Sequence, residues 1–169
     1  VIVAQWNFNG ADANSVPGGG SSPLTSSGTG TIGIVGVTTT SAVPFAAGIS
    51  SAGVGSSDPI LTNPPNLAWA LTNYPALGTG NKQSGIQVNV STVGYAGISF
   101  KFDQRLSNKA GNTHVVQYTL DRTAASPVWV DAQTFTFTPA ATGTGDIWYN
   151  VRSVDLSSVS ALNENPNVA

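Results

Sequence analysis

The sequence contains one histidine, His114, and histidine is the side chain best suited to take a proton from a nucleophile at neutral pH. No cysteine, G-x-S-x-G pattern or H-E-x-x-H pattern accompanies it. The eight Asp and Glu residues are scattered singly, without the paired spacing of a general acid and a general base. We therefore expect that the protein is not an enzyme and that His114 is solvated at a strand edge. A Ser-His-Asp site assembled only in the folded chain is the catalytic alternative.

Three aspartates lie in stretches with the composition of loops, and they are the candidates for holding a metal ion. They are Asp12, Asp58 and Asp146. Calcium prefers carboxylate, amide and backbone oxygens as ligands. None of the three lies in an EF-hand spacing, and a carboxylate in a turn more often accepts hydrogen bonds from the turn backbone. We expect no cofactor, with calcium as the alternative.

Aromatic side chains with nearby amides are the usual means of binding sugars, because a ring stacks on the face of a pyranose while the amides bind its hydroxyls. Two pairs of rings lie in loop-like sequence, and we take them as the ligand-binding candidates: Trp69 with Tyr74, and Trp148 with Tyr149. Buried anchoring of a long loop is the commoner role for such rings. Trp6 and Trp129 lie in strand-like sequence and are expected in the core.

The polar residues of this 169-residue chain are mostly uncharged. Charged residues make up 8% of the sequence, against about 25% in an average soluble protein. Instead there are 19 Gly, 19 Ser and 18 Thr, a composition typical of secreted and surface-exposed proteins. The net charge of -2 excludes the row of phosphate contacts on which nucleic-acid binding depends. No apolar stretch approaches the ~18 residues of a membrane-spanning helix.

Alternation of apolar and polar residues predicts a series of strands. It is clearest over residues 85–90, where Gln87 and Asn89 lie on one face and the apolar residues on the other. Further strands are expected over residues 1–8, 31–40, 98–103, 114–120, 128–130 and 134–138. Between residues 155 and 162 the apolar residues fall three apart, which predicts one helical turn with Asp155 as its N-cap.

These elements predict an all-β fold. We expect one two-sheet antiparallel β-sandwich domain over residues 1–169, of jelly-roll type, with long Gly/Ser-rich loops and one short helical turn near the C-terminus. A closed barrel is the structural alternative.

Three stretches of the sequence resemble a recurrent module of secreted bacterial proteins, many of which carry a C-terminal PEP-CTERM sorting signal. The stretches are residues 91–95 (STVGY), 98–108 (ISFKFDQRLSN) and 116–121 (VQYTLD), and residues 4–9 and 154–167 are also similar to it. The resemblance implies an exported protein of the bacterial cell surface or extracellular matrix, with a jelly-roll-like domain and no assigned catalytic residues.

Two departures from that module bear on assembly. The sorting segment is absent, and the module is expected to continue past Ala169 into one more apolar strand. A sandwich without that strand has an open edge that invites another chain. The apolar segment 1–8 could complete that edge in a neighbouring subunit, and head-to-tail contacts of this kind build filaments. The assembly candidates are Val1, Ile2, Val3, Trp6 and Phe8.

Together these features predict a non-catalytic secreted structural or adhesive surface protein. Its partner would be a second copy of itself, in an extracellular filament or biofilm matrix assembled by strand donation. The alternative is a carbohydrate-binding module of a secreted bacterial protein, with a polysaccharide as its partner.

Overall fold

The computed structural model describes residues 1–10, 16–47, 66–76, 78–107, 110–111, 113–136 and 147–169. They form two compact units, which we treat separately: unit 1 comprises the described residues up to Val90, and unit 2 those from Ser91 onward. All ten described strands pair antiparallel, and no pair joins the two units.

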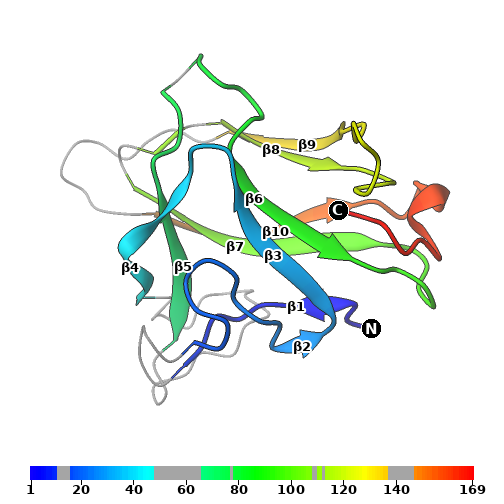
Figure 1. The fold of residues 1–169 in the computed structure, drawn as a ribbon, viewed down its shortest axis with the longest axis horizontal. Helices are drawn as coiled ribbons and strands as arrows, with labels where there is room; N and C mark the ends of the chain where they lie inside the picture. Colours follow the sequence, from blue (N-terminus) through cyan, green and yellow to red (C-terminus); the bar gives the residue numbers. More distant parts are fainter. Residues whose placement is uncertain (11–15, 48–65, 77, 108–109, 112, 137–146) are drawn as a thin grey trace. The chain divides into compact units, whose positions relative to one another are not determined.

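Unit 1 contains three antiparallel pairs of strands (Figure 1). They join β1 (Ala4–Gln5) to β2 (Ser27–Gly28), β3 (Gly30–Val35) to β6 (Gly85–Val90), and β4 (Thr39–Ala47) to β5 (Leu67–Thr72). The β3–β6 ladder stays in register over all six residues of each strand, whereas the β4–β5 register shifts between Thr40 and Phe45. The β1–β2 ladder is only two residues long.

The β3–β6 pair has one polar and one apolar face. Thr31 lies opposite Asn89 and Gly33 lies opposite Gln87, so alternation along the strands places all four on one face. Isoleucines and valines occupy the other face, where Ile32 is buried. This is the alternation expected over residues 85–90, and the register with β3 shows which residues join it.

The core of unit 1 is a small apolar cluster of Val16, Phe45 and Leu67, with Phe8 and Trp69 packed against it. The ring of Phe8 lies 6.2 Å from that of Phe45 and 5.8 Å from that of Trp69, centroid to centroid. These are ordinary distances for packed aromatic pairs. Phe45 is the most buried member, with 1% of its surface exposed.

Unit 2 contains two antiparallel pairs and a short helical turn. The pairs join β7 (Ser99–Leu106) to β10 (Ile147–Asp155) and β8 (Thr113–Tyr118) to β9 (Val130–Thr136), and the 3₁₀ turn η1 spans Ser160–Leu162. The rings of Phe102 on β7 and Phe135 on β9 meet edge to face at 5.6 Å, so the two pairs share a core. In β10 the register shifts beside Val151, whose N–H donates to the Asp103 carboxylate.

The segment after β10 is held by the buried side chain of Thr92. The Thr92 hydroxyl donates to the carbonyl oxygen of Leu162 and accepts a hydrogen bond from the N–H of Asn165. Thr92 and Leu162 are both fully buried. Beyond this point Ala169 exchanges two backbone hydrogen bonds with Thr119, so the segment ends as an added strand-like stretch.

The structure confirms the prediction of an all-β antiparallel fold, which fits the β-sandwich class, and of one short helical turn near the C-terminus. The prediction that Asp155 caps that turn is wrong. Its carboxylate accepts from the N–H of Ser157, and Val159 precedes the turn without a side-chain cap. The jelly-roll type, and a single domain over residues 1–169, stay predictions.

The Phe45→Ala variant tests the core of unit 1. Deleting a fully buried ring removes its transfer free energy and leaves a cavity, so we expect unit 1 to lose about 3–5 kcal/mol of unfolding free energy. Urea denaturation followed by tryptophan fluorescence measures the loss. In the control Val43→Ala the side chain is 51% exposed, and the change should stay within about 0.5 kcal/mol. Equal losses in the two variants would contradict this location of the core.

The Thr92→Val variant tests the hydroxyl that holds the segment after β10. Valine has nearly the same shape, but it leaves the Leu162 carbonyl and the Asn165 N–H without this partner. An unsatisfied buried polar group costs about 1–3 kcal/mol, so we expect a loss in that range. Thr92→Ser keeps the hydroxyl and should lose less. A valine variant as stable as the parent would contradict this role of the hydroxyl.

Candidate functional site

His114 is half-buried in β8, and both of its ring nitrogens have partners within unit 2. One ring nitrogen, Nε2, lies 2.9 Å from the Gly111 carbonyl oxygen, and Nδ1 lies 3.1 Å from Nε2 of Gln104. A carbonyl can only accept, so Nε2 carries the proton and Nδ1 accepts from the Gln104 amide. Burial, more than the nearby Arg152 charge, lowers the pKa of His114 below its ordinary value. The expectation of a solvated His114 is therefore wrong.

A cationic side chain is stacked beside this histidine. The guanidinium of Arg152 lies 4.6 Å from the ring centroid of Phe135 and 4.5 Å from that of Tyr149. Cation–π contacts of this kind stabilise a partly buried charge. The hydrogen bonds and stacking contacts here position neighbouring strands, and the Gln104 amide and the Gly111 carbonyl that contact the His114 ring are neutral groups.

The three calcium candidates, Asp12, Asp58 and Asp146, lie outside the described residues. Among the residues that the structure does describe, no group of three or more His, Cys, Asp or Glu side chains is placed to hold a metal ion. Calcium binding thus stays a prediction from the sequence. No helix within the described ranges is long and apolar enough to cross a membrane.

Three of the four sugar-binding candidates were expected in loops but lie in strands. Trp69 lies in β5, where its ring packs against Phe8 and its N–H donates to the Gly20 carbonyl at 2.9 Å. Trp148 and Tyr149 are half-buried neighbours in β10. Because adjacent residues of a strand point to opposite faces, these two rings do not share a platform.

Tyr74 follows β5 and is 43% exposed, so it is the candidate ring most open to a ligand. The two tryptophans expected in the core, Trp6 and Trp129, fall outside the described strands. Trp129 is 39% exposed, and the prediction that it is a core residue is wrong. Trp6 is half-buried, and its N–H donates to the Pro23 carbonyl.

The segment proposed for assembly divides into an exposed and an anchored part. Val1 and Ile2 are exposed, the former completely. The Val3 carbonyl accepts from the N–H of Thr29, after which the chain pairs with β2 over two residues. Trp6 and Phe8 then fasten the segment to unit 1 through the hydrogen bond and ring contacts described above. The exposed part is therefore Val1 and Ile2, and the anchored part begins at Val3.

The most exposed long strand in unit 2 is β9. Among the described strands it pairs with β8 alone. Five of its seven residues are exposed, and Asp131 is its only charged residue. Its pairing is interrupted near Ala132, after which Gln133 to Thr136 follow β8 in register. Natural edge strands are protected by charged residues, prolines or bulges; β9 has one aspartate and the irregularity at Ala132, but no lysine or proline.

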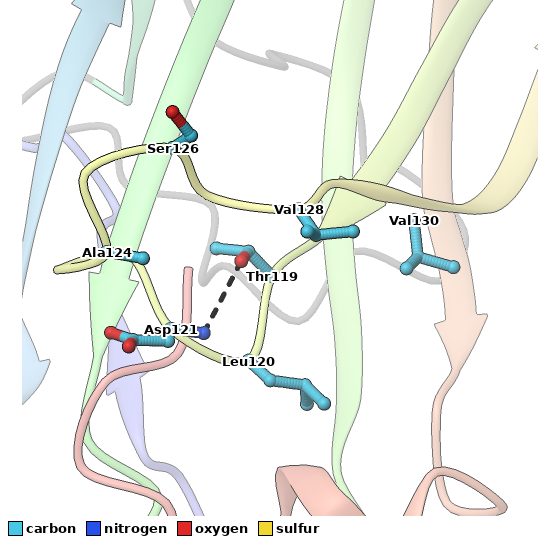
Figure 2. Close-up of a pocket in the computed structure, with 7 residues that line it drawn as sticks. All are labelled: Thr119, Leu120, Asp121, Ala124, Ser126, Val128 and Val130. Carbon is cyan, nitrogen blue, oxygen red and sulfur yellow. Dashed lines mark hydrogen bonds between the residues drawn. The ribbon is translucent and has the colours of Figure 1, made fainter.

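A small apolar pocket adjoins the beginning of β9 (Figure 2). Its volume is about 210 Å³, and it is lined by Thr119, Leu120, Asp121, Ala124, Ser126, Val128 and Val130. The loop after β8 curls back so that Leu120, Val128 and Val130, all exposed, line the opening. Ligand sites usually measure about 300–1,000 Å³, so this pocket fits one side chain better than a whole ligand.

The polar face of β3–β6 forms the other hollow. A groove of about 460 Å³ runs over it, lined by Ser22, Thr31, Ile32, Gly33, Ile34, Val35, Gln87 and Asn89. The amide of Gln87 donates to that of Asn89 at 2.8 Å, and Asn89 donates to the Thr31 hydroxyl at 3.1 Å. Sequence reasoning placed Gln87 and Asn89 on one face but missed the groove, because β3 joins them only through long-range pairing.

Comparison with known proteins gives no family. No protein-family model, no curated protein and no solved structure matches this chain. The resemblance to the exported bacterial module therefore stays a prediction from the sequence, and the function is argued below from the chain's own surfaces.

The environment of His114 predicts a pH dependence of stability. Its pKa lies below 6.5 in the folded chain and near 6.5 in the unfolded chain, so the unfolded chain binds more protons around pH 6. Stability should be highest above that pH and should fall as the pH drops from about 7 to about 5. Urea denaturation across this range measures the slope.

The control for this prediction is His114→Gln, in which the titrating group is gone and the slope should flatten. The pKa values of Asp121 and Asp155 are lowered by hydrogen bonds from Thr123 and Ser157, so these carboxylates lose their proton below the range measured. A slope of the same size in His114→Gln would show that another group is responsible.

Proposed function

We propose that this protein is a non-catalytic structural or adhesive protein of the bacterial cell surface. In this proposal it is a subunit of an extracellular filament or biofilm matrix assembled by β-strand donation. The low charge, the abundance of Gly, Ser and Thr and the resemblance to an exported module support the location. The observation that carries the proposal is the edge of β9, which is long, exposed and almost uncharged.

The acceptor surface combines that edge with the pocket beside it. A strand added along β9 gains main-chain hydrogen bonds, and a side chain that enters the pocket fixes its register. Because Val130 belongs to both, the two features adjoin. Leu120 and Val128 supply apolar surface for the incoming side chain.

The donor in this proposal is the segment Val1–Gln5 of a second copy. Its two leading side chains are exposed and apolar, and they are of a size to enter the pocket. The segment leaves behind a two-residue ladder and the hydrogen bonds to Val3 and Gln5, which main-chain hydrogen bonds along β9 would replace. Trp6 and Phe8 stay packed in their own subunit and anchor the donated segment. Donor and acceptor are different surfaces, as an open filament requires.

A second candidate function is carbohydrate binding. The groove on β3–β6 favours it, because amide and hydroxyl groups of Gln87, Asn89 and Thr31 are part of its lining. The four aromatic candidates support it less, since three of them are built into strands.

Charges placed on β9 should prevent assembly. The double variant Gln133→Lys, Thr134→Lys puts one ammonium on each face of the exposed strand, next to the edge. We expect oligomers to dissociate at concentrations roughly tenfold higher than in the parent, or not to form. Light scattering after size exclusion and electron microscopy measure the effect. Ser158→Lys, Ser160→Lys adds the same charge at exposed positions outside the strands and should assemble as the parent does.

The donor is tested by Ile2→Asp, because a carboxylate in the apolar pocket would be desolvated. Its matched control is Val37→Asp, at another exposed apolar position. A parent protein that stays a 17.2-kDa monomer at every concentration contradicts assembly altogether. Filaments that form unchanged in both the β9 and the Ile2 variants contradict strand donation through these surfaces.

A further inference from the structure

The side chains on the polar face of β3–β6 form a directed hydrogen-bond chain. Gln87 donates to Asn89, and Asn89 donates to Thr31. Since each amide uses an N–H toward the next residue, the hydroxyl proton of Thr31 and the carbonyl oxygen of Gln87 lie at the two ends. Among the described residues neither group is engaged by a further side chain of this chain. A donor and an acceptor are thus held in fixed positions on one rigid strand pair.

Of the two glycines on this face, Gly33 lines the groove beside that chain. A Cβ atom built at Gly33 or at Gly85 would meet no atom within 4 Å. Both residues lie on the polar face, because Gly33 is opposite Gln87 and Gly85 is opposite Val35. The space above Gly33 is therefore open to a ligand instead of being filled by a side chain. At about 460 Å³ the groove lies in the range of small-molecule sites.

The lining carries no ionisable side chain. An anion such as a phosphate would find no cation there, and a cation would find no carboxylate. A ligand that matches the groove presents neutral groups that both donate and accept hydrogen bonds, together with some apolar surface for Val35. Sugar hydroxyls on a pyranose ring have this combination.

We propose that this face binds one sugar unit of a neutral polysaccharide, with the ring over Gly33. Gln87 accepts from one sugar hydroxyl, and Thr31 donates to another. Asn89 is a positioning residue, which holds the other two side chains. The inference rests on the second function proposed above and gives it a site that includes none of the four aromatic candidates.

The test fills the hollow without disturbing the strand. Gly33→Val adds a branched side chain that suits a β-strand and has open space to occupy. Gly111→Val makes the same change at another glycine whose Cβ would meet nothing within 4 Å, outside the groove. Gln87→Ala removes the acceptor at one end of the hydrogen-bond chain.

The probes are dextran, hydroxyethyl cellulose and galactomannan, with polygalacturonate as the charged comparison. Affinity gel electrophoresis gives the dissociation constants, and the side-chain amide signals of Gln87 and Asn89 in ¹H–¹⁵N spectra report where the sugar binds. We expect at least one neutral polysaccharide to bind and to shift both signals. Gly33→Val should weaken binding by at least tenfold and Gln87→Ala by roughly two- to tenfold, with Gly111→Val unchanged.

The failures of site and function can be told apart. If none of the three neutral polysaccharides retards the protein, both carbohydrate binding and this site are overturned. If binding survives Gly33→Val and the amide signals do not shift, the site alone is overturned. Tyr74 is then the next candidate for the sugar contact. Tighter binding of polygalacturonate than of the neutral chains overturns the assignment to a neutral ligand. The electrophoresis is run at concentrations where the protein is monomeric, so the outcome is independent of filament formation.

Discussion

Unit 2 depends on one buried hydroxyl. Thr92 has no exposed surface, and its Oγ1 joins the chain before β7 to the turn around Leu162 and Asn165. Asn165 in turn donates to the carbonyl oxygens of Leu120 and Ala161. A chain this rich in loops must satisfy many backbone groups outside its ladders. Here short polar side chains do so, which explains how the protein keeps its order with few charged residues.

The small number of strand contacts explains the exposed surfaces. Each described strand has a single strand partner, so the apolar clusters stay small and long edges remain. Most proteins cover or charge such edges. In this chain the β3–β6 pair exposes a neutral polar face, and β9 exposes an almost neutral edge. A surface of this kind suits contact with other neutral, hydrogen-bonding polymers, whether peptide or sugar.

Local pattern predicted the strands whose residues alternate, and long-range pairing determined the rest. Residues 85–90 alternate cleanly and form β6 with the predicted bounds. The stretch Leu67–Thr72 contains no β-branched residue before Thr72, so nothing local marks it as a strand, and β4 and the Trp69 contacts hold it extended. The sequence pattern indicated only part of the groove, because it placed Gln87 and Asn89 on one face. Its glycine hollow follows from the register that sets Gly33 opposite Gln87, which no local pattern encodes.

The absence of ionisable groups from the β3–β6 groove also bears on the environments in which it can work. At an ionic strength of about 0.1 M, interactions between exposed charges are screened beyond about 10 Å, and in more concentrated salt sooner. Hydrogen bonds between neutral groups are not screened in this way. A contact made through Thr31 and Gln87 would hold equally in dilute water and in brine.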